Sequence, residues 1–311
     1  MSSLVSLLLP PGCGASVVLA TLQSAHVAAA CAALCWALQV TTGYWSWVDR
    51  LWSLVPAAYA FIFAAHHLES ERVFVMAVLA GLWALRLTAN FARKGGYGAE
   101  EDYRWEILRA WFARHDPTHP LGREAFSLLF VALYQHVLLW LIVAPAAAAA
   151  AAAGGGALTA TDVGLAAAFL LLLLGETITD EQQWAFQSAK HALTPAARAR
   201  AGGDIARGFC TSGAFALSRH LNFFCEQGMW WVWYAFALSA GGPRLSAPLL
   251  GPALLSMLFL GSTTMTEAVT RAKYPAYAAY QRTTSRLLPW LPGVQLDSAE
   301  GRKLVEEATR A

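Results

Sequence analysis

The sequence has little charge. Only 14% of its 311 residues are Asp, Glu, Lys or Arg, whereas an ordinary soluble domain has about 25%. The 22 basic and 20 acidic residues leave a formal net charge of +2, which excludes a nucleic-acid binder driven by net charge. Hydrophobic residues make up 57% of the chain, and this excludes an intrinsically disordered protein.

Cysteine is also scarce, and its spacing carries no motif. The five cysteines include no Cys-x-x-Cys pair, so neither a disulfide framework nor a zinc site is indicated. His115 and His119 flank Pro117, which opposes a shared helical face, and we therefore predict no metal site. The sequence has no Ser-His-Asp spacing, phosphate-binding loop or Gly-x-Gly-x-x-Gly fingerprint.

Long apolar runs are the dominant feature. The first 48 residues contain no Asp, Glu, Lys or Arg, and a helix needs about 20 apolar residues to cross a bilayer. We predict an all-α, polytopic membrane bundle of about seven transmembrane helices. The expected spans are Val17–Val40, Leu51–Leu68, Val73–Leu87, Ala125–Val143, Val163–Gly175, Phe223–Ser239 and Leu245–Met265. We expect one membrane domain over residues 1–311, with its core at 48–281 and flexible tails at 1–16 and 292–311.

The basic residues predict an orientation. Lys and Arg concentrate in Arg86–Arg123, Lys190–Arg219 and Arg271–Arg310. With seven crossings, all three segments fall on one side of the membrane, and basic loops stay in the cytosol. The N-terminus is therefore expected in the lumen and the C-terminus in the cytosol.

Three polar clusters lie on the predicted cytosolic side. In the first, helical spacing places Arg219, Asn222 and Glu226 on one face. An Arg, an amide and a carboxylate suit a phosphate, adenosine or amide ligand. An equally open interpretation is an ion pair between Arg219 and Glu226 that only joins helices.

The other two clusters have similar alternatives. Asp180 and Gln183 follow the fifth span and share one helical face, which fits a ligand-facing role or an amphipathic helix on the membrane surface. Lys273 and Tyr274 precede Pro275, where they could contact a ligand or anchor the chain at the membrane interface.

Several motifs in order resemble one family. The run Ser218-Arg-His-Leu-Asn-Phe-Phe-Cys-Glu226 resembles the "SRHPNYxGE" signature of the steroid 5α-reductase superfamily, and the chain resembles its DUF1295 branch most closely. The further matching segments are Val48-Asp-Arg-Leu-Trp-Ser53, Arg93-Lys-Gly-Gly-Tyr97, Glu101-Asp-Tyr-Arg-Trp105, Asp180-Glu-Gln-Gln183, Thr266-Glu267, Lys273-Tyr-Pro275 and Tyr280-Gln281.

The resemblance implies a helical membrane reductase that uses NADPH, in the endoplasmic reticulum, with a lipid or sterol-like substrate and membrane lipids as its partners and no nucleic acid. It implies that the cofactor is bound by Asp180, Gln183, Arg207, Arg219, His220, Asn222, Glu226, Glu267, Lys273 and Tyr274. We predict reduction of a C=C bond, a reaction of lipid metabolism.

The proton donor of steroid reductases has no counterpart here. The resemblance leads us to look for a Glu in the second span and a Tyr in the third, but the second lacks a carboxylate and the third has Trp83. Tyr97, Tyr103 and Asp49 are the substitute candidates. Two alternatives remain open: a membrane methyltransferase of the isoprenylcysteine or phospholipid type, which uses S-adenosylmethionine, and a non-catalytic membrane scaffold.

Overall fold

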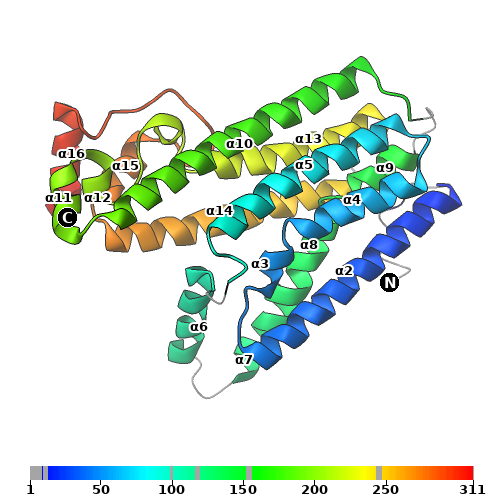
Figure 1. The fold of residues 1–311 in the computed structure, drawn as a ribbon, viewed down its shortest axis with the longest axis horizontal. Coiled ribbons are helices and arrows are strands. Elements are labelled where there is room, and N and C mark those ends of the chain that lie inside the picture. Colours follow the sequence, from blue (N-terminus) through cyan, green and yellow to red (C-terminus); the bar gives the residue numbers. More distant parts are fainter. Residues whose placement is uncertain are drawn as a thin grey trace. The chain divides into compact units, whose positions relative to one another are not determined.

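The computed structural model describes residue 9 and residues 13–98, 101–115, 120–151, 156–242 and 247–310. Most of these residues are helical, and no strand occurs among them (Figure 1). The main helices are α2 (Ala15–Thr42), α3 (Trp47–Leu51), α4 (Leu54–His66), α5 (Glu71–Arg93), α6 (Tyr103–His115), α7 (Pro120–Phe126), α8 (Gln135–Leu141), α9 (Pro145–Ala151), α10 (Ala160–Ala192), α11 (Pro195–Ala201), α12 (Gly203–Arg207), α13 (Leu221–Ser239), α14 (Leu250–Lys273), α15 (Tyr277–Thr283) and α16 (Ala299–Arg310). A π-helix, η1 (Ser127–Tyr134), joins α7 to α8.

The predicted all-α membrane bundle is confirmed. Within the described ranges, six helical segments are long and apolar enough to cross a membrane: Ala15–Thr42, Trp47–His66, Glu71–Arg93, Leu121–Ala151, Ala160–Ala192 and Ala247–Lys273. The sixth expected span, Phe223–Ser239, forms α13, but it is not among the six. Its first turns carry Asn222, Glu226 and Gln227, and several Trp residues follow, so its hydropathy is lower than that of an aliphatic span.

The chain groups into two compact units, where the sequence suggested one domain. The first comprises Met1–Phe169 and Trp230–Leu255, and the second comprises Leu170–Met229 and Ser256–Ala311. The helices α10, α13 and α14 contribute residues to both units. Part of the predicted N-terminal tail, residues 1–8 and 10–12, lies outside the described residues.

The first unit contains a buried ion pair that the sequence did not predict. Arg72 in α5 donates from Nε and Nη2 to Asp162 Oδ2 in α10, at 3.1 and 2.9 Å. Both residues are buried, and Thr159 also donates to the same oxygen. Elsewhere in the unit, Trp83 and Trp230 pack edge to face, with ring centroids 4.9 Å apart. The position expected to hold a Tyr is thus part of an aromatic core.

The second unit corrects the prediction for the C-terminal tail. Residues 299–310 form α16, and its Ala308 is buried with Leu296 against α15. The apolar positions Leu304 and Val305 pack on the same cluster, which explains why this charged segment is an ordered helix. Figure 1 shows α11, α12, α15 and α16 gathered near the C-terminal end of α10.

Close helix packing in the second unit depends on two glycines. A Cβ added at Gly175 in α10 would lie 3.0 Å from Cys225 Sγ, and one at Gly228 in α13 would lie 3.0 Å from Leu172 Cδ1. A larger side chain at either glycine would therefore press on the neighbouring helix. The same two helices carry the polar residues Asp180 and Asn222, which are hydrogen-bonded to each other.

Candidate functional site

Arg219 is the centre of a buried polar cluster in the second unit. Its guanidinium donates from Nε to Glu267 Oε1 at 2.7 Å and from Nη2 to Oε2 at 3.2 Å. The remaining nitrogen, Nη1, donates to the backbone oxygens of Gln281, at 3.1 Å, and Thr284. Every nitrogen of the guanidinium thus has an acceptor within the protein, as a buried charge requires.

Glu267 accepts hydrogen bonds from two further side chains. His220 Nε2 donates to Oε1 at 3.0 Å, and Gln281 Nε2 donates to Oε2 at 2.8 Å. Arg219, His220 and Glu267 are all buried. The carboxylate partner of Arg219 is therefore Glu267 of α14. The alternative interpretation, an ion pair between Arg219 and Glu226 along one helix, is wrong. The reason is that α13 begins at Leu221, so Arg219 lies before the helix and its periodicity does not apply.

A second contact joins α10 to α13. Asn222 Nδ2 donates to Asp180 Oδ1 at 3.2 Å. Each helix also carries a second buried carboxylate one turn away: Glu176 lies four residues before Asp180, and Glu226 lies four residues after Asn222. The amide of Gln183, one turn beyond Asp180, makes no hydrogen bond to any residue that the structure describes. A free amide beside a buried polar contact is suited to recognising a ligand amide.

Two lysine side chains, those of Lys190 and Lys273, lie near the aromatic ring of Tyr274. The Lys190 Nζ lies 6.0 Å and the Lys273 Nζ 5.4 Å from the ring centroid, within reach of a cation–π interaction. Lys190 is buried and donates to the backbone oxygen of Gly208 at 3.1 Å, whereas Lys273 is exposed. This corner, which we call the lysine–tyrosine corner (Lys190, Lys273 and Tyr274), joins the ends of α10 and α14 and can attract an anion.

Arg207 lies in a different environment. It donates to Asp297 and, from Nη2, to Asp204 Oδ1 at 2.7 Å. Burial raises the pKa of Asp204, but hydrogen bonds from Thr211, Arg207 and Ser212 outweigh burial and hold the pKa below its ordinary value. The Arg207 hydrogen bonds likewise lower the pKa of Asp297.

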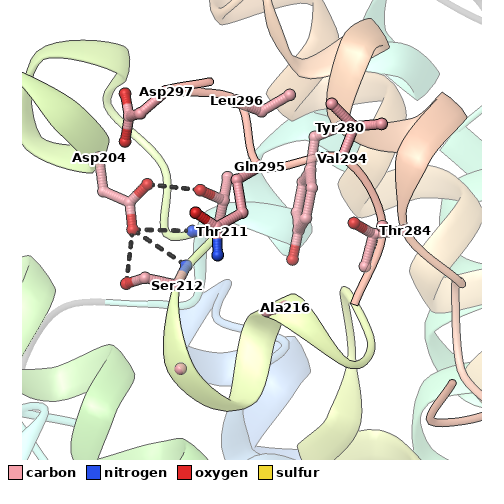
Figure 2. Close-up of a pocket in the computed structure, with 12 residues that line it drawn as sticks. Asp204, Thr211, Ser212, Ala216, Tyr280, Thr284, Val294, Gln295, Leu296 and Asp297 are labelled. Atoms are coloured by element: carbon pink, nitrogen blue, oxygen red, sulfur yellow. Dashed lines mark hydrogen bonds between the residues drawn. The ribbon is translucent and has the colours of Figure 1, made fainter. Parts of the chain in front are cut away.

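Asp204 and Asp297 also line a pocket of about 370 Å³. Figure 2 shows Asp204 hydrogen-bonded to Thr211 and Ser212 on one side of this pocket, with the Tyr280 ring and Thr284 on the other. Two carboxylates at its wall repel phosphate groups. The pocket is therefore poorly suited to the phosphates of a nucleotide, and Arg207 is already neutralised by its two partners.

The three proton-donor candidates lie in the first unit. Asp49 Oδ2 accepts a hydrogen bond from Trp105 Nε1 at 2.6 Å, the Tyr97 hydroxyl donates to the backbone oxygen of Arg50 at 3.3 Å, and the Tyr103 side chain is exposed. Glu101 accepts from the backbone of Trp45 and Ser46. Two segments that carried the resemblance, Val48–Ser53 and Glu101–Trp105, thus meet in space.

Some site residues were not singled out from the sequence. Lys190 and Asp204 both make buried or bridging contacts. A signal existed for Lys190, because it follows Gln183 and Gln187 at helical spacing. Gln281 belongs to the matching segment Tyr280-Gln281, but its hydrogen bond to Glu267, which joins two helices, was not predicted. His119, considered for a metal, lies outside the described residues.

The helices and this buried polar cluster define a polytopic, all-α membrane protein. Within that class, the chain belongs to the DUF1295 family, described as "Protein of unknown function (DUF1295)", which it matches over residues 35–284. It is also similar to a protein of Schizosaccharomyces pombe (strain 972 / ATCC 24843), "Uncharacterized protein C594.04c". The two are 32% identical over 286 residues, which cover 88% of this chain and 80% of that protein. No solved structure matches the chain. The family assignment made from the motifs is confirmed.

Proposed function

We propose that this protein is a membrane oxidoreductase that uses NADPH to reduce a C=C bond of a lipid or steroid-like substrate. The observation that carries the proposal is the buried cluster of Arg219, His220 and Glu267, adjoined along α13 by the contact between Asp180 and Asn222. These are the residues that carry the resemblance to the steroid 5α-reductase superfamily. They come from segments distant in sequence but belong to one compact unit.

The residues present fit NADPH at two places. The lysine–tyrosine corner offers two cations and an aromatic face, the chemistry that phosphates and an adenine ring require. Gln183, with its free amide, and Asn222 fit the carboxamide of the nicotinamide. Arg207 is the exception, since Asp204 and Asp297 already hold its guanidinium. We therefore assign the phosphates to Lys190 and Lys273.

The chain's own residues have three tasks. Glu267 holds Arg219 and His220 in fixed positions and thereby shapes the wall of the site. The lysine–tyrosine corner binds and orients the cofactor, and NADPH supplies the hydride when bound. A proton must also reach the reduced substrate, and Asp49, Tyr97 and Tyr103 remain the candidates. We further propose that the site faces the cytosol from the endoplasmic reticulum membrane.

Ligand-dependent thermal unfolding of the full-length protein in nanodiscs tests this proposal. A ligand at one hundred times its Kd stabilises the folded state by about 2.7 kcal/mol. We expect NADPH to raise the unfolding midpoint and S-adenosylmethionine to leave it unchanged. A shift with S-adenosylmethionine alone would establish the methyltransferase alternative. No shift with either compound at millimolar concentration would favour the scaffold.

A matched pair of lysine variants makes the test specific. Lys273→Gln removes a charge from the proposed phosphate site, and we expect it to weaken NADPH binding by about tenfold or more, because hydrogen bonds to charged groups contribute about 1.5–3 kcal/mol. Lys303→Gln removes an equally exposed lysine on α16 and should leave affinity unchanged. Equal effects of the two variants would overturn the assignment of the phosphates.

A further inference from the structure

The segment between α15 and α16 carries unusual exposed apolar side chains. Leu288 is 67%, Trp290 74% and Leu291 81% exposed, and they fall within four consecutive positions. Large apolar side chains left in water forgo about 1.5–3 kcal/mol each relative to burial. We call this group the Leu288–Leu291 loop.

Backbone hydrogen bonds join the loop and the residues just before it to the segment that precedes α13. Arg219 N donates to Ser285 O at 2.9 Å, His220 N to Arg286 O at 3.1 Å, and Trp290 N to Leu217 O at 3.0 Å. The backbone is thus paired along its length with the segment that leads into α13. The chain on the two sides of the loop also comes together, because Gly293 lies against the backbone of Thr283. A Cβ added at Gly293 would be only 1.7 Å from Thr283 O.

Contacts with α14 set the level of the loop relative to a membrane helix. Arg286 Nη1 donates to Thr264 Oγ1 at 3.2 Å, and its Nε lies 3.8 Å from Glu267 Oε2. Thr264 is exposed and precedes the end of α14 at Lys273 by nine residues, about 13 Å along the helix. The loop therefore starts beside the last turns of a candidate span and does not lie far beyond it.

The part of α14 that precedes Thr264 also exposes apolar side chains. Met257 and Leu260, earlier on α14, are exposed and belong to the span Ala247–Lys273, where lipid is the expected neighbour. Two basic residues, Arg282 and Arg286, precede the loop, and Trp with Lys or Arg is the composition found at membrane interfaces. The geometry points to one occupant of this surface, the lipid bilayer.

We propose that Leu288, Trp290 and Leu291 insert into the interfacial layer of the bilayer on the side where α14 ends. The loop then anchors the Arg219–Glu267 cluster at the membrane surface, because Ser285 and Arg286, just before the loop, accept hydrogen bonds from the backbone N–H groups of Arg219 and His220. This assignment goes beyond the proposed reductase function and does not depend on it.

Depth-dependent fluorescence quenching tests the insertion. Trp290→Cys in the full-length protein is labelled with an environment-sensitive fluorophore and reconstituted into phosphatidylcholine vesicles containing lipids spin-labelled near the headgroup. The signal from labelled wild-type protein, which has five free cysteines, is subtracted. Glu300→Cys, at an exposed position of α16, is the control. We expect several-fold stronger quenching at position 290 than at position 300.

Two results would overturn the proposal. Equal, weak quenching at both positions would place the loop in water. Weak quenching at position 290 together with energy transfer between labelled copies would show that a second copy covers it. If Trp290→Cys fails to fold, a lipid-phase photoreactive carbene reagent applied to the unmodified protein replaces the measurement. Labelling of residues 288–291 above that of α16 would support insertion, and labelling no stronger than that of α16 would contradict it.

Discussion

At the scale of single residues, Glu267 is the carboxylate that accepts the hydrogen bonds of the buried polar cluster in the second unit. Its carboxylate accepts from Arg219, His220 and Gln281, and it is almost fully buried. A buried ion pair adds little net stability relative to an apolar pair, but removing one partner leaves an uncompensated charge. The cluster is therefore sensitive to loss of either member.

We expect Glu267→Gln to lower the free energy of unfolding by about 3–5 kcal/mol, because the Arg219 guanidinium would remain buried without a counter-charge. Denaturant titration of the full-length protein in detergent measures this change. Glu307→Gln is the control, since Glu307 and Arg282 form an exposed pair at 3.7 Å, and such pairs contribute about 0–1 kcal/mol. A cost for Glu267→Gln no larger than that of the control would contradict the buried-pair description.

The lowered pKa of Asp204 predicts a pH dependence. A carboxyl whose folded pKa lies below its unfolded value of about 3.9 contributes stability above that value and loses it as the pH falls through the folded pKa. We therefore expect the wild-type protein to lose stability below about pH 4 and Asp204→Asn to flatten this part of the curve. Unfolding at a series of pH values measures it, with Glu306→Gln on exposed α16 as the control. An unchanged slope in Asp204→Asn would argue against the prediction.

At this scale, the sequence predicted the identity of the site residues more successfully than it predicted their contacts. Arg219, His220 and Glu267 were all named from the motifs and meet in one cluster. Their pairing was not predictable, because Arg219 precedes α13 and its acceptor lies 48 positions away. Helical periodicity describes neighbours on one helix and carries no information on contacts between helices.

At the scale of elements, the contact between α10 and α13 depends on small residues. We expect Gly228→Ile to lower the free energy of unfolding by about 1–3 kcal/mol, because the new side chain would collide with Leu172 and push the helices apart. Gly261→Ala in α14 is the control, since nothing lies within 4 Å of its added Cβ, and Ala favours a helix over Gly by up to about 1 kcal/mol. Similar losses in both variants would contradict close packing at Gly228.

The predicted spans locate the helices well but their ends poorly. The fifth span was expected at Val163–Gly175, whereas α10 continues to Ala192. Its polar second half remains helical because Asp180, Lys190 and their neighbours find partners inside the second unit. Hydropathy reports affinity for lipid, and a helix that leaves the lipid while staying within protein gives no hydropathy signal. The same reason explains why α16 was expected to be a flexible tail.

At the scale of the whole molecule, α13 decides the orientation. Within the part of the chain that the structure describes, six helical segments meet the criteria for a span. Six crossings would leave both chain ends on one side, whereas a further crossing by α13 places them on opposite sides. With 19 residues, α13 is about 28 Å long, close to the thickness of the hydrocarbon core. We expect a glycosylation acceptor fused to the N-terminus to be modified in microsomes and the same acceptor at the C-terminus to remain unmodified. Modification at both ends, or at neither, would contradict the crossing.

The pairing of the Leu288–Leu291 loop with the segment before α13 has a practical consequence. The family match ends at residue 284, one position before Ser285 accepts from Arg219 N and two before Arg286 accepts from His220 N. If the protein were shortened to the matched region for expression, the backbone N–H groups of Arg219 and His220 would lose these two acceptors. A piece of this chain that keeps these two hydrogen bonds must therefore extend beyond the residues matched by the family.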